Sequence, residues 1–143
     1  MVESGFAAQH CSGRDCVVNA DELWSKAPQA ASSARLLLNA GDTSGACNRA
    51  YYAMFDAARA VLLTSGAPVS SQIGKTHSGL IHAFSQHLVK TGRVLKDLGQ
   101  SLARAHELRL VADYTGDQVD VSDAQTAVEQ AEHFIAELNP SPT

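Results

Sequence analysis

Cysteine is scarce in this chain and follows no pattern. The three cysteines, Cys11, Cys16 and Cys47, are an odd number and do not make a disulfide framework. Cys11 and Cys16 have four residues between them, and no second pair of ligands stands at a matching distance for zinc. We therefore expect Cys11 and Cys16 to play no part in a site, and we expect a reducing, cytoplasmic environment.

Long apolar runs and an excess of basic residues are also missing. No run approaches the roughly 18 apolar residues of a membrane span, and the chain does not start with the basic and apolar segments of a secretory signal. We therefore expect a cytoplasmic protein without membrane contact. With 11 basic and 15 acidic residues the net charge is −4, which excludes a protein that coats nucleic acid by bulk charge. Binding of RNA would need a local basic patch, which a dimer can assemble.

The abundant features are alanine and helical periodicity. Hydrophobic residues make up 45% of the 143 residues, which suits one domain with a real core. Apolar residues recur at helical spacing in five stretches, and no stretch reads as a strand. The sequence therefore predicts an all-α antiparallel bundle over residues 21–138, a disordered or loosely packed tail over 1–20, and a short tail over 139–143. The expected helices span about 21–40, 43–65, 76–90, 95–114 and 120–138.

One polar stripe crosses the helix expected at 43–65, which is otherwise apolar almost all round. Arg49, Tyr52, Asp56 and Arg59 follow one another at steps of three and four residues. The stripe is either a set of intrahelical ion pairs, worth a few tenths of a kcal/mol when exposed, or a buried cluster that faces another helix or a second subunit. The sequence leaves both open.

A second polar stripe lies on the helix expected at 95–114. His106, Arg109 and Asp113 are three and four residues apart, and Tyr114 ends the helix. Arg109 and Asp113 make a natural ion pair, and His106 adds a group that titrates near neutral pH. The stripe is either a solvated or interface-lining face, or part of a site in which the Tyr114 phenol points into a groove.

The segment that starts the third helix carries Lys75 and His77. His77, His82 and His87 are five residues apart, which rotates each by about 140° from the last, so we expect no common metal ion. Lys75 and the first amides of the helix either hold an anion or are simply capped.

Three runs of sequence resemble segments of one family, in that family's order. RAYYAMFDAARAVLL begins at Arg49, KTHSG begins at Lys75, and RLVADY begins at Arg109, with VKTG from Val89 between the last two. Together they resemble HEPN-domain proteins over nearly the whole expected bundle. The resemblance implies a helical bundle that dimerises. It also implies a toxin, or the partner of a minimal nucleotidyltransferase encoded beside it.

The resemblance also implies a site. Many family members are metal-independent ribonucleases in which an arginine is followed after about four to six residues by a histidine, at the dimer cleft. This chain departs from that pattern, because Asp56 and Asp113 stand where related chains have histidine. An aspartate is a poor proton donor at neutral pH. The candidate catalytic residues are then Arg109 and His106, and the candidate residues for RNA, nucleotide or partner binding are Arg49, Tyr52, Asp56, Arg59, Lys75, His77, Asp113 and Tyr114.

Three functions follow from these residues. The first, narrowly preferred, is a non-catalytic homodimeric module that binds an RNA, a nucleotide or a nucleotidyltransferase in a toxin–antitoxin-like pair. The second is a metal-independent ribonuclease toxin. The third is a structural interaction domain whose arginine and aspartate stripes are buried salt bridges that fix helix register. None of the three calls for a cofactor.

Overall fold

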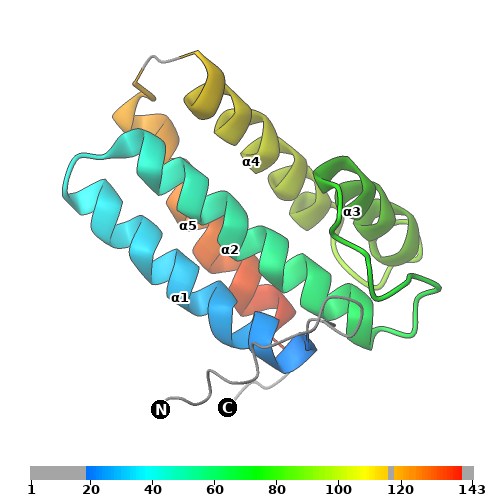
Figure 1. Cartoon of the computed structure of the whole chain (residues 1–143). Coiled ribbons are helices and arrows are strands. Elements are labelled where there is room, and N and C mark those ends of the chain that lie inside the picture. The colour runs from blue at the N-terminus through cyan, green and yellow to red at the C-terminus, as the bar shows by residue number, and fades with distance from the viewer. Residues whose placement is uncertain (1–18, 116–117, 140–143) are drawn as a thin grey trace, which may run out of the picture.

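The computed structural model describes residues 19–115 and 118–139 and consists of helices (Figure 1). The described residues contain no strand, which confirms the predicted all-α bundle. The elements are α1 (Ala20–Asn39), α2 (Thr43–Thr64), α3 (His77–Phe84), the π-helical turn η3 (Ser85–Val89), α4 (Lys96–Tyr114) and α5 (Val121–Leu138).

The expected tails fall mostly outside the described residues, and so do Cys11 and Cys16. In the part that is described, the first helix begins at Ala20, one residue before the expected start, and its cap is Asn19. The Asn19 side chain accepts a hydrogen bond from the Asp21 amide at 2.7 Å, and the Glu22 carboxylate accepts one from the Asn19 amide at 3.3 Å. This reciprocal arrangement is a capping box, which satisfies two amides that the helix itself leaves unpaired.

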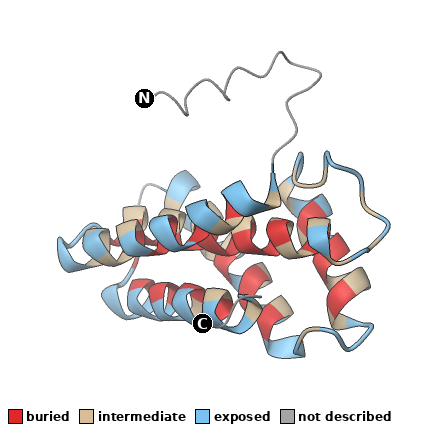
Figure 2. Ribbon diagram, turned by 90° about the horizontal axis from the view of Figure 1, so that it is seen from below, coloured by how far each residue is buried: buried red, intermediate tan, exposed pale blue. Residues whose placement is uncertain are grey.

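The helix α2 lies in the middle of the bundle and contacts all four other α-helices (Figure 1). Half of its buried residues are alanines, which let neighbouring backbones approach closely, and the larger ones include Tyr51, Met54, Phe55 and Leu62. Figure 2 shows the buried residues facing inward where the helices meet. Cys47 is part of this core, and burial raises the pKa of its thiol to about 11, so the thiol is unreactive at neutral pH.

Two helices differ in detail from the prediction. Pro28 lies inside α1 without ending it. The helix expected at 76–90 is α3 followed by the π-helical turn η3, in which the Lys90 amide donates to the Ser85 carbonyl at 2.9 Å. This hydrogen bond spans five residues instead of four, and nothing in the local sequence predicted it.

The segment between α2 and α3 packs against Arg59 and leads directly to His77. Gly74 there has a φ of +103°, a conformation that favours glycine. A Cβ atom at Gly74 would lie 2.9 Å from both Cδ and Nε of Arg59. Gly74 is therefore required both by its backbone conformation and by the arginine beneath it.

We expect Gly74→Ala to destabilise the fold more than Gly66→Ala does. Gly66 also has a positive φ, +82°, but a Cβ there meets nothing within 4 Å. Gly66→Ala should therefore cost only the backbone strain, about 1 kcal/mol, whereas Gly74→Ala must also displace Arg59. Urea unfolding of the two variants measures the difference, and equal losses would show that the loop does not pack on Arg59.

Candidate functional site

Aromatic, imidazole and guanidinium side chains from three helices meet at one corner of the bundle. We define the imidazole–arginine cluster by Tyr51, Tyr52 and Phe55 of α2, His77 of α3, and His106 and Arg109 of α4. Tyr51 is the centre of this cluster. Its side chain is 0% exposed, and its ring contacts the rings of Tyr52, Phe55, His77 and His106.

The two histidines of the cluster face each other. The His77 and His106 rings are stacked, with centroids 5.5 Å apart and planes 16° from parallel. The Tyr51 hydroxyl and Nδ1 of His77 form a hydrogen bond of 2.8 Å, which fixes the His77 ring at the start of α3. His106 reaches the same place from α4, with its ring centroid 5.3 Å from that of Tyr51. Two imidazoles from distant parts of the sequence thus become neighbours.

Arg109 completes the cluster one helical turn beyond His106. Its side chain is 12% exposed, and Nη1 donates to the Tyr52 hydroxyl at 2.9 Å. The guanidinium carbon lies 5.4 Å from the Tyr51 ring centroid and 5.6 Å from that of Tyr52, within cation–π range. The Asp113 carboxylate is 3.7 Å from Nη1, which is a loose ion pair. The Arg109 guanidinium is therefore held more by the two tyrosines than by the Asp113 carboxylate.

Two buried polar atoms of the cluster have no hydrogen-bond partner among the described residues. They are Nε of Arg109 and Nδ1 of His106. Buried polar atoms are nearly always paired in folded proteins, so each exception calls for an explanation. Both atoms belong to α4 and to the same cluster.

Burial sets the protonation of these groups. It lowers the pKa of both His77 and His106, and the positive charge of Arg109 lowers both pKa values further. Burial also raises the pKa of the Tyr51 phenol, against the smaller opposite effect of Arg109. At neutral pH the cluster consequently presents two neutral imidazoles beside one fixed positive charge.

The structure unites some of the predicted site residues and separates others. Tyr52, His77, His106 and Arg109 belong to the cluster, and Asp113 contacts it through Arg109. Tyr114 does not point into a groove, because it is 81% exposed. Lys75 is exposed as well, and the Thr76 hydroxyl accepts the Gly79 amide at 3.1 Å, so this helix start is capped in the ordinary way.

The polar stripe of α2 does not form the intrahelical ion pairs that were one reading of the sequence. Asp56 has no cation within ion-pair distance among the described residues, and burial raises its pKa although Lys26, Arg49 and Arg59 all act to lower it. These three cations, with Asp56 between them, are named the α2 basic patch. Lys26 comes from α1, and Arg49 of α2 lies one helical turn from Tyr52, so the patch adjoins the cluster.

Sequence reasoning missed Tyr51. It was assigned to the apolar face of the helix because it stands among alanines, methionine and phenylalanine. The available indication was the pair of adjacent tyrosines, since two such rings on neighbouring positions cannot both reach solvent from a helix buried nearly all round. Its hydrogen bond to His77 spans 26 residues, which no local pattern predicts.

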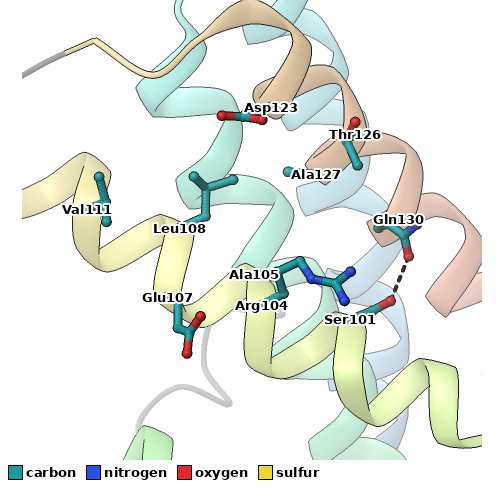
Figure 3. Close-up of a pocket in the computed structure, with 10 residues that line it drawn as sticks. All are labelled: Ser101, Arg104, Ala105, Glu107, Leu108, Val111, Asp123, Thr126, Ala127 and Gln130. Atoms are coloured by element: carbon teal, nitrogen blue, oxygen red, sulfur yellow. Dashed lines mark hydrogen bonds between the residues drawn. The ribbon is translucent and has the colours of Figure 1, made fainter.

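A separate pocket lies between α4 and α5 (Figure 3). Its volume is about 330 Å³, its walls include Ala105, Leu108 and Ala127, and a hydrogen bond of 2.6 Å from Ser101 to Gln130 crosses one end. None of the predicted site residues lines it. The pocket is thus on another face of α4 from the cluster.

Neither a metal site nor a membrane span is found in the part of the chain that the structure describes. No three histidine, cysteine or acidic residues there are grouped closely enough to hold a metal ion. No helix of that part is long and apolar enough to cross a bilayer.

Comparison with known proteins gives a consistent result. The sequence model of the HEPN domain matches residues 20–139. A UPF0332 protein from Gloeobacter violaceus is 37% identical over 80% of this chain and 88% of its own length. One from Thermotoga maritima is 36% identical over 80% of this chain and 84% of its own length. A Methanocaldococcus jannaschii protein named "putative toxin" is 33% identical over 73% of this chain and 74% of its own length.

The lowered pKa values of His77 and His106 predict that acidification destabilises the fold. The unfolded chain binds protons at these imidazoles near the ordinary pKa of 6.5, whereas the folded chain binds them only at lower pH. The free energy of unfolding should therefore fall as the pH drops below about 6.5. We expect His77→Gln and His106→Gln each to reduce the fall in unfolding free energy that urea unfolding measures between about pH 7.5 and 5.5.

The matched control for this titration is His133→Gln, because His133 is exposed on α5 and belongs to no cluster. It should leave the pH dependence unchanged. If the two cluster variants lose as much stability on acidification as the wild type does, burial of the imidazoles does not govern their protonation.

Proposed function

Because the chain belongs to the HEPN-domain family, we propose that it is a toxin-like protein that binds RNA phosphates at the imidazole–arginine cluster. A nucleotidyltransferase is its proposed partner in a toxin–antitoxin-like pair. The relative named "putative toxin" supports the toxin-like part of this proposal. The cluster supports the RNA part.

The observation that carries the proposal is the incomplete hydrogen bonding of a nearly buried arginine. Arg109 keeps a permanent positive charge, yet it has one loose ion pair and an unsatisfied Nε. A phosphate binds a guanidinium strongly, because its negative charge and its oxygen acceptors match the positive charge and the N–H donors of the arginine. Nδ1 of His106, also unsatisfied, is the second contact available to such a ligand.

The α2 basic patch favours a polymer over a free mononucleotide. Lys26, Arg49 and Arg59, which all act on Asp56, supply positive charge beyond the residues of the cluster. A chain of phosphates needs such a track, and the chain as a whole, at net charge −4, offers cations only locally. The Tyr52 ring of the cluster, one helical turn from Arg49, is half-buried and offers an aromatic surface for stacking with a base.

We also propose that the functional form is a homodimer joined through the end of α4. Val111 is 50% exposed and Tyr114 81%, and both stand within a turn or two of Arg109. Exposed apolar side chains in a group favour an interface. A two-fold contact there would cover them and would bring a second Arg109 to the same cleft.

A second function, metal-independent RNA cleavage, is favoured by the stacked histidines. One neutral imidazole would take the proton of a 2′-hydroxyl, which then attacks the adjacent phosphorus. The other, when protonated, would give its proton to the departing 5′-oxygen. Arg109 would stabilise the charge that builds on the phosphate. Here His77 and His106 would replace the histidine that the family motif places near Asp113.

Replacing the arginine of the cluster tests the binding proposal. We expect Arg109→Ala to weaken binding of a fluorescein-labelled single-stranded RNA by at least about tenfold, measured by fluorescence anisotropy, because one charge-assisted contact is lost. It should also relieve any growth arrest caused by expressing the chain alone. The control is Arg104→Ala, which removes the same charge from another face of α4. Equal RNA affinities of the wild type and Arg109→Ala would show that the cluster is not the RNA-binding site.

Replacing the histidines tests cleavage separately. We expect cleavage of the same RNA in excess EDTA to be fastest below about pH 6.5, because the lowered pKa values leave both imidazoles neutral above it. His77→Gln and His106→Gln should each abolish cleavage while RNA binding persists. Absence of cleavage by the wild type between about pH 5 and 8 would reject the ribonuclease and leave the binding proposal standing.

A further inference from the structure

A second hollow, distinct from the cluster and from the pocket of Figure 3, lies between the α3–η3 rod and the first half of α4. Its volume is about 570 Å³, and its walls come from Ile81, Val89 and Ala103 with several polar residues. No residue of the imidazole–arginine cluster lines it. The two helical segments that form it are neighbours in Figure 1.

The charge of this cavity has one sign. Lys90 and Lys96 line it together with His82, and no aspartate or glutamate does. This is unusual for a chain with 15 acidic and 11 basic residues. Neither lysine forms an ion pair with a described residue. Two unpaired ammonium groups at one cavity favour an anionic occupant.

The π-helical turn places one of the lysines there. Residues five apart on an α-helix differ in direction by about 140°, so Ser85 and Lys90 would face different ways. In η3 the Lys90 amide instead bonds to the Ser85 carbonyl, and residues five apart share a face. Both side chains consequently line the cavity. Such π-helical turns occur often at functional sites.

The floor of the cavity is apolar and tightly built. A Cβ atom at Gly99 would lie 3.0 Å from Cγ2 of Val89, so glycine lets α4 approach η3 closely. Ile81 and Ala103 extend this floor, and Gln100 and Ser85 stand beside the lysines as hydrogen-bond donors. The cavity therefore joins an apolar surface to a cationic rim.

We propose that this cavity binds a small amphipathic anion, with a compact head such as phosphate between Lys90 and Lys96 and an apolar body over Ile81, Val89 and Ala103. The volume is that of a typical small-molecule site, and a few polar groups on an apolar lining are what such sites share. This site does not depend on the proposed RNA function. It gives the protein a place for a ligand nearer the start of α4 than the cluster is.

The test separates the head of the ligand from its body. Calorimetric titration of the full chain uses three probes: 1-naphthyl phosphate, inorganic phosphate and 1-naphthol. The proposal expects 1-naphthyl phosphate to bind at least about tenfold more tightly than either fragment, because only it meets both the rim and the floor. Equal affinities for the three probes, or no measurable binding, would overturn the proposal.

Variants locate the site. The double variant Lys90→Gln and Lys96→Gln should weaken 1-naphthyl phosphate binding at least about tenfold. Arg104→Gln, a control on another face of α4, and Arg109→Ala, in the cluster, should leave it unchanged. If the lysine variant keeps full affinity for 1-naphthyl phosphate and loses affinity for the labelled RNA instead, the lysines belong to an RNA track and the small-ligand site is rejected. If the lysine variant loses affinity for 1-naphthyl phosphate and keeps its affinity for the labelled RNA, the small-ligand site is supported. This conclusion does not depend on the outcome for the RNA proposal.

Discussion

The structure depends on how one buried phenol is satisfied. Tyr51 is fully buried at the centre of the imidazole–arginine cluster, and its hydroxyl would cost about 1–3 kcal/mol if it were left unpaired. His77 supplies the partner, which ties the start of α3 to the middle of α2. Once His77 is fixed there, His106 stacks on it from α4 and Arg109 lies over the tyrosine rings. The polar corner of the molecule is thus organised by a requirement of its core.

The two sides of α2 make contacts of different kinds. On the side of α1 and α5 the contacts are mainly alanine and other apolar residues, which pack closely. On the side of α3 and α4 the contacts are tyrosine, histidine and arginine. The first side supplies stability, and this allows the second side to hold unsatisfied groups such as Nε of Arg109. Without the apolar packing of α1 and α5 on α2, the polar residues on the other side of α2 would not be held in position.

Sequence reasoning succeeded where the information is local. The number and order of the helices follow from apolar periodicity, and the shared face of His106 and Arg109 follows from their spacing of three residues. It failed where a contact spans many residues or where burial decides the outcome. The sequence pattern assigned Tyr51 to the apolar core, but its hydroxyl bonds to His77. Asp56 is buried without the intrahelical ion pair that its spacing allowed. The η3 turn arises from a backbone hydrogen bond that no residue type indicates. The resemblance identified the family, but only the fold shows which histidines reach Arg109.

The loss of a motif histidine has to be judged in three dimensions. Asp113 stands near the position where the family pattern has histidine, and an aspartate near an arginine can orient it but is a poor proton donor. Two other imidazoles nevertheless reach the same corner, His106 from the turn of α4 that precedes Arg109 and His77 from the start of α3. They arrive neutral, because burial and Arg109 both disfavour their protonation. Substitution within a linear motif therefore has to be weighed against the side chains that the fold brings to the same place, and in this bundle two imidazoles lie there.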